Sequence, residues 1–391
     1  MKPRKIKRRP TYRRRNPYRR RSPIWKTLGA VVACVGIVAL GVLAGKWLLN
    51  RPQTTPDVST PSSTTSTDST ASTTTTTQTT VTPAPQKSLS GLRAVYLPPS
   101  ALGDTAAFEQ TVTAAKAAGY NGVVLELKDT VGRVYFQAES DTVKKAGSVH
   151  ATAVSKAQLK ALLAVCEEQD MLAVGYLYAF YDRTYRSMDA IIEYYAEGTM
   201  TDWLDNAYDK GGKTWLNPYK PGARQYLVGL GKELQEVGFT ALIYDGVQFP
   251  FQRQLAFFDS SLTNQQKPEI AALQTFVSEA KTALTGMELS FCCAGESATG
   301  SNTAIYGSDN PLKFGGDFLS PMLPQSGTQA MLDKIRFRAD ELGESAPALL
   351  PWLNVNGQNA NQIKAMLKAV GDGPVVVYAA NGSYDFAALK G

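Results

Sequence analysis

The sequence has 391 residues, enough for two or three average domains or for one large barrel with appendages. Its net charge of +7 is unevenly distributed, because 13 of the 41 Lys and Arg residues lie within residues 1–26, which contain no acid. The rest of the chain therefore carries more acidic than basic side chains. This balance argues against a broad nucleic-acid surface on the folded part, and we expect no nucleic-acid partner.

Histidine and cysteine are too scarce for several kinds of site. His150 is the single histidine, so a multi-histidine metal centre is excluded and a Ser-His triad would have to use this residue. The 4 cysteines show no CxxC spacing, and the neighbours Cys292 and Cys293 would point to opposite faces of a strand. The sequence also lacks a P-loop, a dinucleotide fingerprint and a GxSxG elbow. We therefore expect no metal site and no cofactor.

The N-terminal part predicts a membrane anchor. Residues 1–26 are basic and interrupted by prolines, which predicts a disordered cytoplasmic tail. Residues 27–50 contain an uncharged apolar run that ends near Lys46 and Trp47, and they are long enough to form a transmembrane helix. A secretory signal peptide has a similar pattern, but the long basic region and the lack of a clear cleavage site favour an uncleaved, single-pass anchor.

Residues 51–89 are rich in Thr and Ser with scattered Pro, and they contain almost no large apolar residue. Such a segment cannot bury enough surface to fold, so it predicts a disordered linker that acts as a stalk. With the charge bias before the anchor, this places the C-terminal domain outside the cell, at a distance from the membrane.

Residues 90–391 alternate between strand and helix patterns, which predicts one α/β domain. Helical patterns separate most of the strand candidates, as where Ser155 and Gln158 form a capping-box signature before an apolar helix face. Eight candidates over about 300 residues match a (β/α)8 TIM-type barrel, and a doubly wound open sheet is the alternative. The candidate strands are Leu92–Leu97, Val123–Lys128, Leu172–Tyr178, Ala241–Tyr244, Glu288–Cys293, Phe318–Leu323, Ala348–Leu353 and Val375–Ala379.

Asp245 stands where the fourth of these strands should end. The apolar run before it predicts a buried parallel strand, and Gly246 allows the backbone to turn sharply beside it. Barrel enzymes place their chemistry at the carboxyl ends of strands, so Asp245 is a candidate catalytic carboxylate. An equally simple interpretation is that Asp245 caps a turn or a helix.

Five motifs in the domain resemble, in order, those of the putative glycoside hydrolase family of (β/α)8 barrels, formerly a domain of unknown function. The resemblance runs from about Arg93 to Tyr384 and implies a barrel that hydrolyses glycosidic bonds. The matching segments are Glu126–Gly132 for a DVKDDSG-like pattern, Trp215–Tyr219 for WVNPY, Asp245–Pro250 for DYVRFP, Ser320–Met322 for SPM, and Pro351–Leu353 for PWL.

The sequence departs from the family pattern at three motif positions. Gln248 replaces an Arg in the fourth-strand motif, and Cys292 stands where the family has an acid after the fifth strand. The seventh strand continues as Trp352-Leu353-Asn354 without the family's Asp. If the missing acids carry the family's chemistry, this member has an altered mechanism or has lost activity.

Glycoside hydrolysis needs two carboxylates across the scissile bond, one as acid and one as nucleophile or base. Asp245 is our candidate for the second role. Glu296, three residues after the fifth strand, is a candidate for the acid, although a surface loop position explains it as well. Glu126 and Asp129 end the second strand and are further candidates. Lys128 lies between these two, and it either points to the other face, contacts substrate or pairs with one of them.

Several other side chains at predicted strand ends are candidates for substrate binding. Aromatic rings there could stack on sugars, although ordinary packing explains each one equally well. The candidates are the aromatic residues Tyr176, Tyr178, Trp215, Trp352 and Tyr384 and the amides Asn217, Gln248 and Asn354. The segment 182–212 predicts an inserted flap over this mouth, although its acids could equally form a solvated face.

The sequence thus predicts a membrane-anchored, extracellular glycoside-hydrolase-like protein that acts on a cell-wall or extracellular polysaccharide by carboxylate chemistry. Two alternatives stay open, a catalytically degenerate carbohydrate-binding protein and a cell-envelope scaffold. The sugar, the linkage, the stereochemical outcome and the oligomeric state do not follow from the sequence.

Overall fold

The computed structural model describes residues 87–251 and 268–390, which belong to one compact unit, Val81–Gly391. The predicted basic tail, the predicted membrane span and nearly all of the predicted linker lie outside the described residues. Within the described ranges, no helix combines the length and the apolar character needed to cross a membrane.

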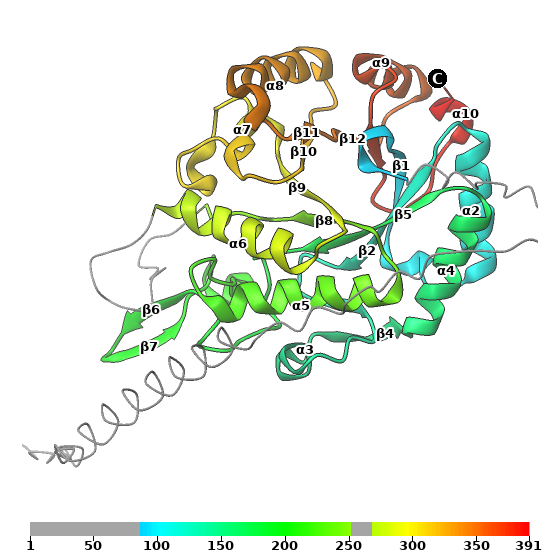
Figure 1. The fold of residues 1–391 in the computed structure, drawn as a ribbon. Helices are drawn as coiled ribbons and strands as arrows, with labels where there is room; N and C mark the ends of the chain where they lie inside the picture. The colour runs from blue at the N-terminus through cyan, green and yellow to red at the C-terminus, as the bar shows by residue number, and fades with distance from the viewer. Residues whose placement is uncertain (1–86, 252–267, 391) are drawn as a thin grey trace, which may run out of the picture. The chain divides into compact units, whose positions relative to one another are not determined.

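Eight strands of the described chain form a closed parallel barrel (Figure 1). The first strand pairs in parallel with both the second and the last, so the sheet closes on itself. This closure confirms the predicted (β/α)8 barrel and excludes the open sheet. In order around the barrel, the strands are β1 (Arg93–Leu97), β2 (Gly122–Lys128), β5 (Leu172–Tyr178), β8 (Ala241–Asp245), β9 (Glu288–Ala294), β10 (Phe318–Leu323), β12 (Trp352–Asn354) and β13 (Val375–Tyr378).

The seventh predicted strand is interrupted in the structure. Its expected span is divided into β11 (Ala348–Leu349), which pairs with β10, and β12, which pairs with both β10 and β13. Pro351 lies between the two pieces. Because proline has no amide hydrogen to donate, one hydrogen bond of the ladder is lost at this position.

Helices cover the outside of the barrel (Figure 1). The long ones in the described ranges are α2 (Thr105–Ala117), α4 (Lys156–Glu168), α5 (Pro221–Val237), α6 (Glu269–Ala283), α8 (Thr328–Leu342) and α9 (Ala360–Val370). The short ones are α3 (Asp141–Ala146), α7 (Gly295–Ala298) and α10 (Phe386–Leu389). Single 3-10 turns are η1 (Leu89–Gly91), η2 (Pro99–Ala101), η3 (Tyr208–Lys210), η4 (Thr303–Tyr306), η5 (Pro311–Lys313) and η6 (Gly343–Ser345).

The connections after β2 and β5 carry additional strands. They are β3 (Val134–Phe136) and β4 (Val149–Val154) after β2, and the hairpin of β6 (Glu193–Ala196) and β7 (Thr199–Asp202) after β5. The connection from β9 to β10 holds only α7 and two 3-10 turns where a regular unit would have a long helix.

Helix α4 begins as predicted, but only half of the predicted capping box forms. The Ser155 side chain accepts a hydrogen bond from the amide of Gln158. The Gln158 side chain does not return to Ser155, and instead donates to the Leu102 carbonyl and to the Thr105 hydroxyl. This long-range contact ties α4 to the start of α2, which a local sequence pattern does not reveal.

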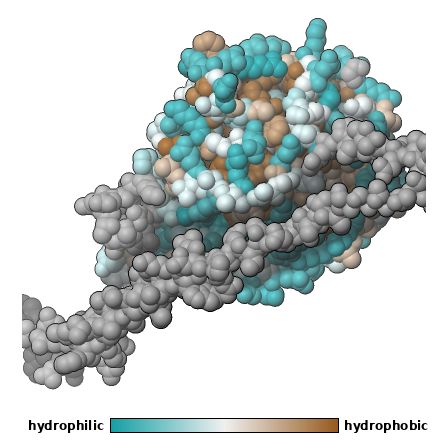
Figure 2. All heavy atoms as spheres, in the orientation of Figure 1, coloured by the Kyte–Doolittle hydropathy of each residue, from teal (hydrophilic) through white to brown (hydrophobic). Residues whose placement is uncertain are grey.

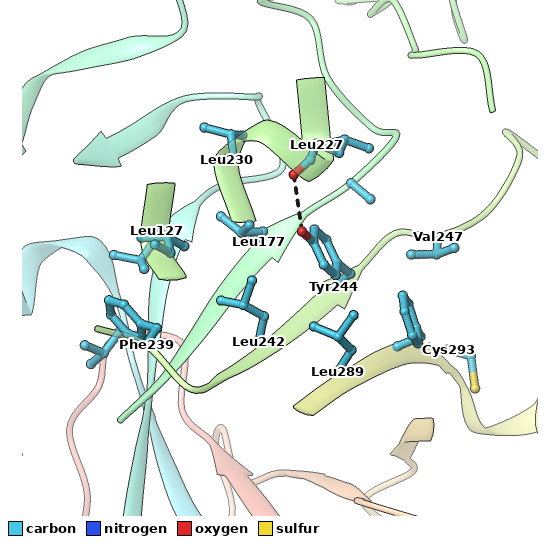
Figure 3. Packing of buried hydrophobic residues seen from close by; sticks show 14 of the residues in the cluster. Leu127, Leu177, Leu227, Leu230, Phe239, Leu242, Tyr244, Val247, Leu289 and Cys293 are labelled. Atoms are coloured by element: carbon cyan, nitrogen blue, oxygen red, sulfur yellow. Dashed lines mark hydrogen bonds between the residues drawn. The ribbon is translucent and has the colours of Figure 1, made fainter. Parts of the chain in front are cut away.

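The outer core lies between the strands and the helices. Figure 3 shows Leu177 and Leu242 of neighbouring strands pointing to the side from which Leu227 and Leu230 of α5 approach. The Tyr244 hydroxyl donates to the Leu227 carbonyl over 3.2 Å, so even the polar atom of this buried ring is satisfied. Each fully buried side chain of this kind stabilises the fold by about 1.5–3 kcal/mol.

The inner core consists of the alternate strand residues that point into the barrel. Small and branched side chains fill its lower part, among them Val124, Val174, Ile243 and Val376. Because side chains alternate along a strand, the next inward positions toward the carboxyl ends are two residues further on. These next positions carry the polar and aromatic side chains described below.

The base of the barrel is covered by the residues that precede β1. Leu89 is fully buried in the inner cluster, although the sequence pattern assigns it to the linker. Glu288 holds this segment in place, because its carboxylate accepts hydrogen bonds from the Ser88 hydroxyl and the Leu89 amide, both 2.6 Å long. The ordered fold therefore includes residues that the predicted boundary at residue 90 leaves out.

Hydrophilic residues cover much of the face of the molecule drawn in Figure 2, with hydrophobic residues seen mainly between them. One large hydrophobic side chain that stays exposed is Met322, near the carboxyl end of β10, with an exposed fraction of 40%. Its position matters because it belongs to the wall of the cavity at this end of the barrel.

Candidate active site

A cavity of about 300 Å³ lies at the carboxyl ends of the strands, where barrel enzymes hold their active sites. Its wall is formed mainly by the inward-facing residues near the strand ends. The lining residues are Tyr96, Glu126, Thr130, Tyr176, Tyr178, Asp245, Met322, Leu323, Trp352, Asn354 and Tyr378.

Asp245 lines this cavity, as predicted from its place at the end of β8. Its side chain accepts hydrogen bonds from the Tyr176 hydroxyl and from the Gly246 amide. Burial raises the pKa of the Asp245 carboxyl, and these two hydrogen bonds oppose part of that rise. The residue does not cap a helix in the described chain.

Gly246 is required at the position that follows. Its φ of +63° is unfavourable for other residues, and a Cβ there would lie 2.6 Å from the Tyr178 ring. The sharp turn after β8 therefore keeps Tyr178 against the backbone beside Asp245. A glycine is therefore needed after Asp245 both for the turn that ends the strand and for the close contact with Tyr178.

Glu126 of β2 is the second carboxyl group in the cavity, with its side chain accepting a hydrogen bond from the Tyr96 hydroxyl. Burial raises the pKa of Glu126 to about 7, the Tyr96 hydrogen bond lowers it in part, and the charges of Asp129 and Asp245 raise it. Only β5 separates β2 from β8 in the barrel. The structure thus brings together Glu126 and Asp245, two of the four predicted catalytic residues.

Lys128 points away from the cavity because β2 contains a β-bulge. Glu126 pairs with Tyr176, but Lys128 pairs with Leu177, so the register shifts between them. A bulge changes the face to which the following side chain points. Lys128 is fully buried among the outer elements, where it pairs with Asp182 at 2.9 Å. Lys128 therefore belongs to a structural ion pair and does not occupy the predicted substrate-binding position.

Asp129 also lies outside the cavity wall. Its carboxylate accepts hydrogen bonds from the amides of Val131 and Arg133, at 2.8 and 2.9 Å, and from the Tyr135 hydroxyl at 3.0 Å. These contacts fix the turn between β2 and β3. Its effect on the site is electrostatic, through the pKa of Glu126.

Glu296 is not brought to the cavity. It lies in the short helix α7 with an exposed side chain, which accepts a hydrogen bond from the Asn302 side chain. The reason is local: the chain turns into α7 directly after β9, and this turn carries the side chain outside the cavity wall. This position matches the alternative interpretation of Glu296 as a surface residue.

Five aromatic rings line the cavity, and three of them, Tyr176, Tyr178 and Trp352, were predicted. Tyr176 and Trp352 have ring centroids 5.3 Å apart, and Tyr176 lies 6.4 Å from Tyr178. Sequence reasoning missed Tyr96 and Tyr378, whose rings are 4.7 Å apart. Both occupy the inward positions of their strands nearest the carboxyl end, so counting alternation from the buried Ala94 and Val376 would have found them.

Two predicted aromatic residues serve other purposes. Trp215 packs against Tyr181, with ring centroids 4.6 Å apart, and its indole donates to Asp205. The Tyr384 hydroxyl donates to the carbonyls of Tyr96 and Val377, which ties the C-terminal segment to β1 and β13. Neither residue lines the cavity.

Of the three predicted amides, only Asn354 lines the cavity, where its side chain accepts hydrogen bonds from Asn356. Asn217 is fully buried, and its side-chain oxygen accepts a hydrogen bond from the Tyr219 amide. Gln248 accepts a hydrogen bond from the Tyr306 hydroxyl outside the wall. The last two therefore support the loops.

Cys292, which replaces the acid of the family pattern, lies inside the barrel on β9. It is 1% exposed and aligned with Ser320 of β10, and burial raises the pKa of its thiol well above the usual range. It is thus a neutral group at physiological pH. Strand β9 supplies no carboxylate to the cavity, whose two carboxyl groups come from β2 and β8.

The insertion at residues 182–212 forms the β6–β7 hairpin and its flanking turns, and none of its residues lines the cavity. Two of its acids are used locally: Asp202 pairs with Arg186, and Asp205 accepts hydrogen bonds from the Lys213 amide and from Trp215. In the described ranges, no group of three or more His, Cys, Asp or Glu side chains is placed to hold a metal ion.

The barrel is similar to solved glycosidases. An exo-β-N-acetylglucosaminidase from Vibrio harveyi aligns at 9% identity and a TM-score of 0.51, over 77% of this chain and 53% of that one. An α-L-fucosidase from Paenibacillus thiaminolyticus aligns at 13% identity and a TM-score of 0.51, over 76% of this chain and 48% of that one. This chain therefore spans about half the length of each, and the likeness shows the fold.

A hypothetical protein from Ruminiclostridium thermocellum aligns at 23% identity with a TM-score of 0.42, over 50% of this chain and 96% of that one. No curated protein matches the chain. A family profile described as a putative glycosyl hydrolase domain matches residues 94–331, which include both cavity carboxyl groups but not the Pro351–Leu353 motif. Because this match extends over more than half of the sequence, the chain belongs to the putative glycosyl hydrolase domain family.

Proposed function

We propose that this domain is a glycoside hydrolase in which Glu126 is the general acid and Asp245 is the nucleophile or general base. One observation carries the proposal: a buried carboxyl group, Asp245, and a half-buried one, Glu126, each hydrogen-bonded to a tyrosine hydroxyl, share a cavity at the carboxyl end of a glycosidase-type barrel. Glycoside hydrolysis uses such a pair, one on each side of the scissile bond.

The environments of the two carboxyl groups support this division of roles. A pKa of about 7 leaves a large fraction of Glu126 protonated at neutral pH, as a general acid requires. Asp245 receives a hydrogen bond from a backbone amide as well as one from a tyrosine, and both favour its charged form. The pair therefore resembles the two-carboxylate arrangement in which environment separates the acid from the anion.

In the proposed reaction, the Glu126 carboxyl donates its proton to the glycosidic oxygen as the bond from that oxygen to the anomeric carbon breaks. Asp245 then either bonds to the anomeric carbon or removes a proton from the water that does so. In the first case, the Glu126 carboxylate accepts a proton from the water that releases the sugar, and both residues return to their starting states. The anomeric configuration of the product decides between the two routes.

For the substrate, we propose a carbohydrate polymer at the cell surface. The aromatic cavity wall supports a sugar ligand, since aromatic faces pack well on sugar rings. The sequence alone supports this location, through the basic residues 1–26 before the apolar residues 27–50 and the Thr/Ser-rich linker after them.

The test replaces Asp245 by Asn, which keeps the shape of the side chain and its contacts with Tyr176 and Gly246 nearly unchanged. We expect turnover of a panel of aryl glycosides to fall by about a hundredfold or more, while binding of the sugar is largely retained. Glu296→Gln is the matched control, because it removes one carboxylate outside the cavity. Unchanged turnover in Asp245→Asn would contradict the proposal.

A second candidate function is glycan binding without catalysis. The observation that favours it is Cys292, a neutral thiol at a position where the family pattern has an acid. Under this alternative the aromatic cavity still binds sugars, but neither the native protein nor the variants hydrolyse them. Binding and turnover measured on the same panel separate the two candidates.

A further inference from the structure

Buried acids elsewhere in the domain are paired with lysines. Besides Asp245, three acidic side chains of the described chain are buried. A carboxylate oxygen of each lies within 3.0 Å of a lysine Nζ. These pairs are Asp182 with Lys128, Glu193 with Lys220, and Glu233 with Lys156. Pairing is the expected pattern, since an unpaired buried charge is costly.

The cavity carboxyl groups break this pattern. Among the described residues that form the wall, two are acidic and none is Lys, Arg or His. Glu126 and Asp245 are instead held by tyrosine hydroxyls and, for Asp245, by one backbone amide. The cavity thus holds the negative charge of Asp245, and that of the ionised fraction of Glu126, without a cation from its own wall.

The aromatic rings add to this preference. Tyr96 lies at the centre of the cluster, with ring centroids at 6.0 Å from Tyr176, 6.2 Å from Trp352 and 4.7 Å from Tyr378. Ring faces carry partial negative charge and attract ammonium groups, most strongly where water is excluded. Aromatic rings beside carboxylates are therefore a setting for an organic cation.

Trp352 supplies an independent sign of a ligand. The residue is 2% exposed and lines the cavity, and its indole Nε1 has no hydrogen-bond partner among the described residues. A buried donor without a partner costs about 1–3 kcal/mol, and because Nε1 itself is buried, a ligand oxygen recovers this cost when the ring shifts toward it on binding. A sugar hydroxyl or ring oxygen is such an acceptor.

We propose that the cavity selects a sugar with a free ammonium group, that is, an N-deacetylated amino sugar within a polymer. This inference rests on the proposed function, and it names the substrate class of the same site. The ammonium would lie against the aromatic rings and the carboxylate of Asp245, and the indole of Trp352 would donate to a sugar oxygen. Uronic acids are disfavoured, because a substrate carboxylate would meet two acids and no cation.

The test measures binding of matched oligosaccharide pairs to the full chain, each pair differing only in whether the amine is free or N-acetylated. One pair has the gluco and one the galacto configuration. Binding is measured by calorimetry at a pH below the pKa of the sugar amine, so that the free amine is protonated. We expect the free-amine member of at least one pair to bind about tenfold more tightly. Equal binding, or tighter binding of the acetylated member, in both pairs would overturn the inference.

A charge variant makes the test specific to this cavity. Thr130 is an exposed residue of the cavity wall, and Thr130→Lys adds a cation to the wall that Glu126 and Asp245 also line. We expect it to remove most of the preference for the free amine. Thr113→Lys, which adds the same charge on the exposed face of α2, should keep the preference. A preference that survives in Thr130→Lys would place the amine elsewhere and overturn the inference.

Turnover of aryl glycosides of the same sugars, with the amine either free or N-acetylated, is measured in parallel and separates the two proposals. Amine-selective binding without any turnover would contradict the hydrolase and support the selective site. Turnover of these glycosides without amine-selective binding would support the hydrolase and contradict the selective site.

Discussion

Glu126 and Asp245 show how single side chains set the chemistry of this cavity. Both are carboxyl groups whose pKa is raised by burial, and each accepts a hydrogen bond from one tyrosine. They differ in the amide of Gly246, which donates only to Asp245. They also differ in Asp129, whose charge acts on Glu126 from the end of its own strand. These local differences favour a proton on Glu126 and a negative charge on Asp245.

The pH dependence of activity follows from Glu126. A general acid works in its protonated form, so activity on a neutral glycoside should be lost as pH rises through about 7. The Tyr96 hydrogen bond lowers this pKa, so Tyr96→Phe should raise it and move the alkaline limb of kcat/KM to higher pH. Tyr120→Phe is the control, since this buried hydroxyl lies outside the cavity. A limb that stays in place or moves to lower pH in Tyr96→Phe would contradict this assignment.

At the scale of elements, the end of β2 decides which side chains reach the cavity. Strict alternation would send Glu126 and Lys128 to the same face, but the bulge between them turns Lys128 outward to Asp182. Gly132 permits the close approach of Asp182, because a Cβ at this position would lie 2.1 Å from its carboxylate. Because of the bulge, Glu126 faces the cavity, whereas Lys128 faces the outside of the barrel and pairs with Asp182.

The buried pair at this bulge should be important for stability. Lys128→Met would leave the charge of Asp182 buried without a partner, and we expect it to lower the free energy of unfolding by about 3–5 kcal/mol. Lys313→Met removes the same charge from the exposed pair with Asp309, and its cost should be below about 1 kcal/mol. Denaturant unfolding of both variants is the measurement. Equal costs for the two would show that the buried pair has no special role.

The positions of the strands were easier to predict than the directions in which side chains near the strand ends point. Apolar runs marked all eight strands, and β5 and β10 have the predicted bounds, because buried parallel strands are nearly continuous in hydrophobicity. The bulge left no such signal, since it depends on pairing with β5. For the same reason, the sequence could not show that Glu296 turns outward with α7 while Glu126 turns inward. Pairing and turn geometry are tertiary properties.

At the scale of the whole molecule, the order of the motifs identified the barrel, but the motifs mix catalytic and supporting residues. Asp245 and Trp352 reach the cavity, whereas Trp215 and Asn217 hold the connection after β5. A motif shows that a position is constrained, and either role constrains it. Burial and hydrogen bonding of each side chain had to be known before the two roles could be separated.

The whole chain also predicts a topology. Because residues 1–26 are basic and residues 27–50 are apolar, we expect protease added to intact cells to cut within residues 51–89 and release the barrel. The measurement is immunoblotting of the cell and medium fractions with an antibody to the barrel, with a cytoplasmic protein as the lysis control. Full protection of the barrel until the cells are lysed would contradict the outward orientation.

The division of roles between Glu126 and Asp245 is the central claim, and the leaving-group dependence of two variants tests it most directly. A dinitrophenyl leaving group departs without protonation, whereas an alkyl leaving group needs an acid. We therefore expect kcat/KM, which reports the steps up to cleavage of the glycosidic bond, to fall by about a hundredfold or more in Glu126→Gln on alkyl glycosides but little on the dinitrophenyl glycoside, and to fall on both substrates in Asp245→Asn. Equal losses of kcat/KM for Glu126→Gln on both substrates, or an unchanged kcat/KM of Asp245→Asn on either, would contradict the account.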